Sequence, residues 1–167
     1  MTALSLGLGL GIGAGTSTAN PGPINQHEIH GFLFESREAV QHCNAQWVEG
    51  SMLPSLIISY HAPGRSPVTL TRAQYLQLFR ERCRQSYQWG TQAFGHAALS
   101  VRVRPHHTEV EGVLERGPMA EFYIALHVLR MTPESVQIVR VKHVFVRGAD
   151  GKPAMKQSDY FVDVGGF

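Results

Sequence analysis

Two histidines in apolar segments are the first candidates for chemistry in this 167-residue chain. His127 lies within Ala120–Met131 (AEFYIALHVLRM), and His143 lies within Val136–Arg147. Imidazole titrates near neutrality and an apolar pocket shifts its pKa further, so either ring could act as a general acid or base. The simpler interpretation is a core or rim histidine with one satisfied hydrogen bond, and for either residue alone we favour it.

Tyrosines and other aromatic residues supply a second set of candidates. The phenol of Tyr60 or Tyr123 could donate a hydrogen bond to an oxyanion that develops on a substrate. Large aromatic rings could also line a ligand pocket, although such rings more often belong to the core. The candidate catalytic residues are His127, His143 and Tyr123. The candidate ligand-binding residues are Tyr60, Tyr75, Phe79, Trp89 and Phe145.

The carboxylates are placed less favourably for catalysis. Asp150 lies in an expected turn, and Asp159 and Asp163 share one side of the last expected strand with Gln157, which is typical of a solvated face. Three further acids share one face of another strand and also indicate solvent exposure: Glu109, Glu111 and Glu115. Since none of these acids is placed in a pocket, the sequence weakens the enzyme interpretation.

Few residues have the spacing of a metal or cofactor site. His27 and His30 are three apart and His106 and His107 are adjacent, but neither pair comes with the further ligands that zinc needs. The glycines of Gly9–Ala14 match a dinucleotide-binding pattern by letters only, because no strand precedes them. We therefore expect no metal and no cofactor.

The composition is that of one ordinary globular domain. Apolar residues make up 43% of the chain and charged residues 17%, and the formal net charge is +2. A chain of this length can bury a substantial core. Because so small a charge creates no strong field, we expect no nucleic-acid partner.

The N-terminal segment differs from the rest of the chain. Residues 1–27 contain no Asp, Glu, Lys or Arg, and an apolar run at Leu4–Ala14 precedes the small residues of Thr16–Ala19. This pattern resembles a secretory signal, although it lacks a basic start, and the alternative is a disordered glycine-rich leader. The run is too short to span a membrane. We expect a leader at 1–24 and a single domain at 25–167, secreted or periplasmic if the leader is a signal and otherwise cytoplasmic.

Two cysteines leave one question open. Cys43 and Cys83 both lie on apolar faces of expected helices, where a thiol behaves as a small hydrophobe. In an exported chain they could pair and close a loop of about forty residues. Two reduced core thiols are an equal alternative.

The spacing of apolar residues predicts two helices separated by short strands. Helices are expected at 26–46 and 71–84, where apolar residues recur every three or four positions, and a short strand at 56–60. Thr71 and Gln74 form a capping-box pattern at the second helix start. This second helix would present Tyr75 and Phe79 to the sheet.

The rest of the chain reads as strands. Ala120–Met131 is apolar on both faces and could be a helix by periodicity alone, but its Phe, Tyr, Ile and Val residues favour a central strand. On that strand Tyr123 and His127 would share a face. Four or five consecutive antiparallel strands with helices on one face give an α+β fold.

This layout resembles the NTF2-like superfamily, also called SnoaL-like or cystatin-like. The likeness rests on the long first helix, the strand LIISYH at Leu56–His61, the capped helix at Thr71–Glu81 and the strand series ending at Val141–Pro153. The resemblance implies a strongly bent antiparallel sheet with the N-terminal helices packed in its concave face. It also implies a conical pocket that serves enzymes, ligand binding or dimer assembly.

Three functions follow from the resemblance and the candidate residues. The first is an exported domain that binds a small apolar ligand or a protein partner without catalysis. The second is an isomerase, dehydratase or cyclase that uses a pocket histidine as its base. The third is a structural dimer or secretion-apparatus component. A two-sided apolar strand at Ala120–Met131 would need cover on its outer side, so we expect a homodimer through the outer sheet face.

Overall fold

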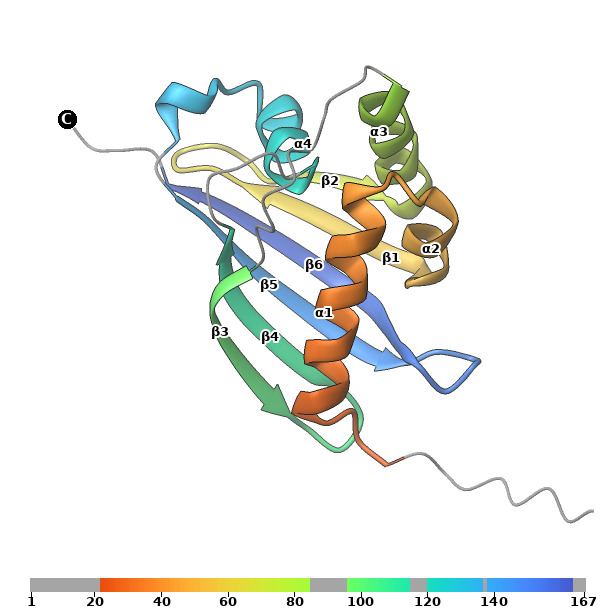
Figure 1. The fold of residues 1–167 in the computed structure, drawn as a ribbon. Coiled ribbons are helices and arrows are strands. Elements are labelled where there is room, and N and C mark those ends of the chain that lie inside the picture. Colours follow the sequence, from red (N-terminus) through yellow and green to blue (C-terminus); the bar gives the residue numbers. More distant parts are fainter. Residues whose placement is uncertain (1–21, 85–95, 115–119, 137, 164–167) are drawn as a thin grey trace, which may run out of the picture.

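The computed structural model describes residues 22–84, 96–114, 120–136 and 138–163. Figure 1 shows a curved sheet with the helices gathered on one side of it. The helices are α1 (Gln26–Gln41), α2 (Ala45–Gly50), α3 (Arg72–Arg84) and α4 (Ala120–Leu129), with a short 3₁₀ turn at Pro133–Ser135. The strands are β1 (Met52–His61), β2 (Val68–Thr71), β3 (His96–Val103), β4 (Thr108–Leu114), β5 (Ile138–Arg147) and β6 (Pro153–Asp163).

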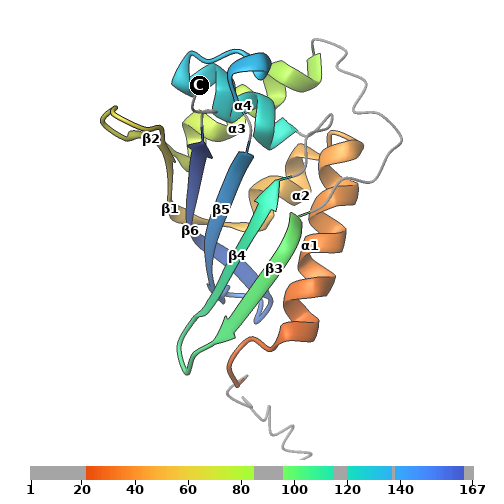
Figure 2. The same cartoon turned by 90° about the vertical axis from the view of Figure 1, so that its left-hand side faces the viewer.

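The six strands form one sheet in the order β2-β1-β6-β5-β4-β3. The β1–β6 pair is parallel, and the other neighbouring strands are antiparallel. Viewed from the side in Figure 2, α1 and α2 lie along the concave face, and α3 and α4 lie over one end of the sheet. The predicted α+β class with a bent sheet and helices in its concavity is confirmed.

The first helix starts at the expected residue, Gln26, and ends earlier than expected. The Asn25 side chain accepts a hydrogen bond from the Glu28 backbone N–H, and the Glu28 carboxylate accepts one from the Asn25 backbone in return. The predicted end near Gln46 was wrong, because Cys43 has φ +53° and interrupts the helix. Asn44 then caps α2 as a separate helix.

The third helix agrees with its prediction. The Thr71 hydroxyl accepts a hydrogen bond from the Gln74 backbone N–H, and the Gln74 side chain accepts one from the Thr71 backbone, so the expected capping box is present. Tyr75 and Phe79 are buried, as the apolar spacing predicted, and Leu76 is buried beside them.

The segment that was predicted as a central strand is the helix α4. Phe122, Ile124, Ala125, Leu126 and Leu129 of this helix are all buried. A helix that is covered on most sides carries no alternating pattern and no clear stripe, so periodicity cannot separate it from a buried strand. Its Ala, Leu and Glu residues are good helix formers. The two-sided apolar strand, on which the expected dimer interface depended, is therefore absent from this position.

A long-range hydrogen bond stabilises the C-terminal end of α4. Arg130 has φ +53° and ends the helix, and the Nη1 atom of Arg65 donates a hydrogen bond of 2.8 Å to the Leu129 carbonyl. Arg65 lies in the loop between β1 and β2. This contact joins α4 to the edge of the sheet and satisfies a carbonyl that a helix end otherwise leaves unpaired.

The two cysteines are paired. Cys43 and Cys83 form a disulfide with their Cα atoms 5.8 Å apart. The bridge joins the turn after α1 to the last turn of α3, and it decides the question that the sequence left open.

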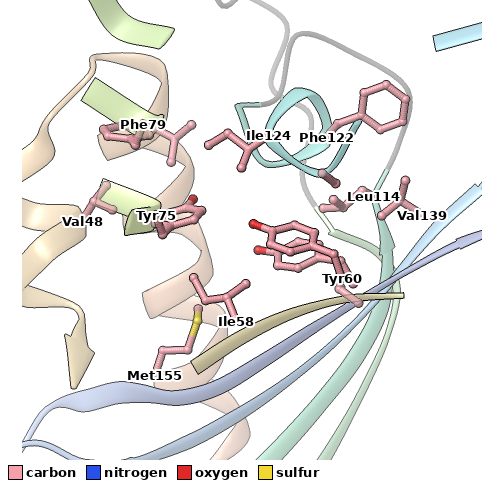
Figure 3. Close-up of a cluster of buried hydrophobic side chains, with 14 of the residues drawn as sticks. Val48, Ile58, Tyr60, Tyr75, Phe79, Leu114, Phe122, Ile124, Val139 and Met155 are labelled. Atoms are coloured by element: carbon pink, nitrogen blue, oxygen red, sulfur yellow. The ribbon is translucent and has the colours of Figure 1, made fainter. Parts of the chain in front are cut away.

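The core lies between the concave face and the helices. Figure 3 shows side chains from the sheet, such as Ile58 and Val139, meeting side chains from the helices, such as Phe79 and Ile124. Ile24, just before the first helix, is also buried, and its carbonyl accepts a hydrogen bond of 2.7 Å from the Thr108 hydroxyl. The strands extend beyond their predicted ends, since β1 begins at Met52 and not at Leu56.

Candidate functional site

The interior of the cone contains a buried carboxylate that the sequence analysis did not select. Glu121 lies in the first turn of α4 and is only 9% exposed. Burial raises the pKa of its carboxyl from 4.5 to about 7, because water no longer solvates the charge. Within the described part of the chain, no hydrogen bond or ion pair reaches this carboxylate. Glu121 is thus a group that can hold or release a proton near neutral pH.

Three tyrosines from three elements lie around this carboxylate. Tyr60 of β1, Tyr160 of β6 and Tyr75 of α3 are all buried. Burial is the main cause that raises the pKa of each phenol, and the charge of Glu121 raises all three further. The phenols therefore keep their protons and act as hydrogen-bond donors.

The β1–β6 register brings two of these tyrosines together. Tyr60 and Tyr160 are direct partners in the parallel pair, and their rings stack with centroids 5.1 Å apart and planes 12° apart. The two rings therefore lie side by side on the inner face of the sheet. A hydrogen bond with the Ser158 side chain lowers the pKa of Tyr160, opposing the effect of burial.

Tyr60 differs from its stacked neighbour in its hydroxyl group. The ring is fully buried, and the hydroxyl has no hydrogen-bond partner among the described residues. Figure 3 shows Tyr60 rising from the sheet with its hydroxyl directed toward Tyr75 of α3. A buried phenol without a hydrogen-bond partner loses about 1–3 kcal/mol of hydration free energy, and no hydrogen bond among the described residues compensates for this loss.

The structure places His143 on the inner face, as its alternation predicts. Its ring is 1% exposed, and Nδ1 lies 2.7 Å from the Ser158 hydroxyl on the neighbouring strand. The rings of Phe145 and Tyr160 lie edge-on to the imidazole, with centroids 6.1 and 5.9 Å from its centroid. His143 thus belongs to the same interior as Tyr60, and its role as a catalytic residue stays a prediction.

The other two candidate catalytic residues are located differently because Ala120–Leu129 is a helix. His127 is exposed, and Tyr123 is half-buried with its ring against Phe122 at 5.5 Å. On a strand the two residues would have shared a face, but on a helix they are four positions apart and lie beside each other along its surface. The structure therefore does not bring His127 into the interior with His143.

Four of the five candidate ligand-binding residues belong to the core. Tyr60, Tyr75, Phe79 and Phe145 are buried, which is compatible with either a packing or a ligand-binding role. Trp89 lies outside the described residues.

One acid that was predicted to be solvated is buried instead. Asp159 lies on the outer sheet face but is only 8% exposed. Its carboxylate accepts a hydrogen bond of 2.8 Å from Gln157 and lies 3.0 Å from Nε2 of His61. His61 itself stacks on Phe161 with ring centroids 4.5 Å apart. The His61 and Phe161 rings and the Gln157 amide cover the Asp159 carboxylate. Alternation along a single strand does not reveal this cover.

The first turn of α4 carried a signal that could have identified Glu121. It is an acid within the otherwise apolar run AEFYIAL. Acids are almost never fully buried unless paired, so one within a fully apolar segment indicates a functional group. On a strand, Tyr123 and His127 would share one face of this segment, and Glu121 would lie on the same alternation as both of them.

Two surface hollows are lined by described residues, and both lie away from Glu121. One has a volume of about 440 Å³ and lies between α1, α2 and the turn that joins β5 to β6. The other, of about 380 Å³, is lined by residues that include Pro23, His106 and Arg147. In the described ranges no group of three or more metal-binding side chains occurs, and no helix is long and apolar enough to cross a membrane.

Comparisons with known proteins identify the fold. No protein-family model and no curated protein matches the chain. A protein from Catenulispora acidiphila, solved in complex with S-DNPA, superposes with a TM-score of 0.52 at 15% identity over 82% of this chain and 92% of its own. A proposed dehydratase of the NTF2-like family from Streptomyces avermitilis gives 0.53 at 14% identity, over 85% and 96%.

A third neighbour is a proposed ketosteroid isomerase from Parabacteroides distasonis. It superposes with a TM-score of 0.51 at 13% identity over 83% of this chain and 89% of its own. These similarities show a shared architecture, and identities this low carry no activity from one chain to another.

Proposed function

We propose that this chain, which has the NTF2-like fold, binds a small molecule with an apolar body and one polar atom inside its cone. The observation that carries the proposal is the Tyr60 hydroxyl, which is fully buried without a hydrogen-bond partner in the described structure. Buried polar groups in folded proteins are nearly always hydrogen-bonded. An oxygen atom of a ligand beside Tyr60 would accept this hydrogen bond.

The side chains around Tyr60 suit such a molecule. Tyr75 and Phe79 of α3 and Ile124 of α4 form an apolar surround, and Glu121 supplies a second polar group. Figure 3 shows Phe122 and Ile124 of α4 above Tyr60, so α4 forms part of the surround of the proposed ligand. Pockets of this kind obtain affinity from apolar contact and orientation from a few polar groups.

A second candidate function is proton transfer next to a carbonyl group. Glu121 has a pKa of about 7, which suits a general base at neutral pH. Tyr60 would donate to the oxygen on which negative charge develops. We prefer Glu121 to His143 as the base, because the His143 ring is already bonded to Ser158.

Paired ligands test the binding proposal. α-Tetralone has a ketone oxygen, and tetralin has the same ring system without it. We expect α-tetralone to bind the wild type more tightly than tetralin, and Tyr60→Phe to bind the two equally. A neutral hydrogen bond contributes about 1 kcal/mol, so the difference should be about fivefold. Absence of saturable binding, or a ketone preference that survives in Tyr60→Phe, would overturn the proposal.

Hydrogen–deuterium exchange at the carbon next to the ketone separates binding from proton transfer. If Glu121 is a base, the wild type accelerates exchange in α-tetralone and Glu121→Gln does not, while both still bind the ketone. The same exchange assay on a His143→Ala variant tests His143, which is the base that the sequence suggested. Binding without accelerated exchange leaves a binding protein, and loss of exchange in His143→Ala alone would assign the base to His143.

Export and self-association stay proposals with separate support. The disulfide between Cys43 and Cys83 is typical of an oxidising compartment and favours export. No described helix covers the outer sheet face, where Ile57 is 46% exposed, and this favours a homodimer through that face. Light scattering after size exclusion tests the dimer, and the mass of the protein recovered outside the cell tests cleavage of the leader.

A further inference from the structure

The 440 Å³ hollow has a lining that does not include Glu121 or the interior tyrosines. Its walls come from the N-terminal half of α1, from α2 and from the turn between β5 and β6. We call it the α1–α2 hollow. Its rings are Phe32 and Trp47, which contact each other with centroids 5.4 Å apart. An aromatic surface of this kind binds apolar bodies and cations.

Two helix glycines keep this hollow open. Gly31 lies in the middle of α1 and Gly50 is the last residue of α2, and both line the hollow. A Cβ atom added to either would meet nothing within 4 Å, and neither glycine has a positive φ. Packing and backbone conformation therefore do not require glycine at these positions. Glycine inside a helix is unfavourable relative to alanine, so Gly31, in the middle of α1, breaks a local rule without a structural gain.

The charges around the hollow favour a cationic ligand. The Glu28 carboxylate is neutralised by Arg147, whose Nη2 lies 3.1 Å from Oε2. Asp150 and Lys152 have opposite charges and lie on the same turn. Glu35 of α1 remains, and no hydrogen bond or ion pair from the described residues reaches its carboxylate. Counted with a neutral histidine, the lining residues carry two negative units, and Arg147, which pairs with Glu28 from outside the lining, leaves one of them unbalanced.

We propose that the α1–α2 hollow is a second binding site, which takes a small organic cation with an aromatic or apolar body. The body packs against Phe32 and Trp47 in the space above Gly31, and the ammonium group pairs with Glu35 at the rim. This site is independent of the interior around Tyr60, so the two can be tested separately.

Three probes of one shape test the site: phenethylammonium, neutral 2-phenylethanol and anionic 3-phenylpropionate. Binding is followed by NMR, using the backbone amide signals of Gly31 and Gly50, which resonate apart from most others. We expect saturable shifts of these two signals with phenethylammonium and weaker binding of the neutral alcohol. Equal or tighter binding of 3-phenylpropionate, or no saturable shift with the cation, would overturn the proposal.

Two variants locate the bound cation. Gly31→Leu fills the hollow and should abolish binding, while its Tm stays equal or rises because the helix loses a glycine. Glu35→Gln should weaken phenethylammonium binding about threefold, as expected for an exposed ion pair, and leave 2-phenylethanol unaffected. Glu38→Gln, on the same helix but outside the lining, is the matched control. Unchanged binding in Gly31→Leu, or equal effects of Glu35→Gln and Glu38→Gln, would contradict the assignment.

Discussion

His61 and Asp159 are joined across the parallel strands β1 and β6, with Nε2 of the histidine 3.0 Å from Oδ1 of the carboxylate. The pair lies on the outer sheet face, yet Asp159 is nearly buried. Gln157 donates a hydrogen bond to the other carboxylate oxygen. These three side chains form a polar cluster that connects two strands distant in sequence.

We expect Asp159→Ala to lower the free energy of unfolding by about 2 kcal/mol, because it removes a buried acceptor and leaves the half-buried His61 ring and the Gln157 amide without it. Asp163→Ala is the matched control on the same strand. Its ion pair with Arg140 is exposed, and its loss should change stability by no more than about 0.5 kcal/mol. Urea unfolding of both variants measures the difference, and equal losses would show that burial of Asp159 contributes nothing.

Glu121 should make the protein less stable as the pH rises. Its folded-state pKa is about 7 and its ordinary value is 4.5, so between these values the folded protein holds a proton that the unfolded chain releases. Stability falls across this window, by about 3 kcal/mol in total, and is constant with respect to this group below and above it.

The Glu121→Gln variant tests this pH dependence. The amide cannot ionise, so the decline in unfolding free energy between pH 4.5 and 7 should become smaller by that amount. Glu111→Gln, on the exposed outer face, should keep the wild-type decline. If Glu121→Gln and the wild type declined in parallel, Glu121 would not be the buried ionising group.

The two stacked tyrosines should respond differently to loss of their hydroxyl groups. Tyr60→Phe removes a buried hydroxyl that has no partner among the described residues, so stability should stay the same or rise by about 1 kcal/mol. Tyr160→Phe removes a group that interacts with Ser158, so stability should fall by about 1 kcal/mol. Thermal and urea unfolding check the order, and a larger loss in Tyr60→Phe would show that its hydroxyl is bonded within the fold.

The disulfide should contribute strongly to stability. Cys43 and Cys83 are 40 positions apart, and closing a loop of this length stabilises a protein by about 4 kcal/mol in the chain-entropy model. We expect the Cys43→Ser, Cys83→Ser double variant to lose most of this in urea unfolding. Mass spectrometry with alkylation before and after reduction confirms the bridge, and an unfolding midpoint that reduction leaves unchanged would contradict its contribution.

Local signals along the chain predicted some elements well and others poorly. The Thr71–Gln74 capping box and the spacing of Tyr75 and Phe79 located α3 within one residue of its start, because caps and apolar spacing act within one helix. The helix α4 was missed because it is covered by the sheet and α3. A segment buried on most sides carries no periodicity that separates a helix from a strand.

In the candidate site, too, local signals predict some residues and miss others. The inner-face positions of His143 and Phe145 follow from alternation on one strand, which is visible in the sequence. Glu121 was missed, because its importance depends on how the segment folds and on what covers it. Asp159 was placed on the correct face but in the wrong environment, since its cover comes from His61, nearly a hundred positions earlier in the chain.

The sequence by itself determined the α+β class, the capped helices and the inner face of β5, because capping, helical spacing and alternation are properties of neighbouring residues. Only the tertiary structure decided that Ala120–Leu129 is a helix, that Cys43 meets Cys83, and that Glu121 lies buried near the Tyr60 hydroxyl. Each of these depends on contacts between segments far apart in the chain. Burial and pKa follow from those contacts and not from local pattern.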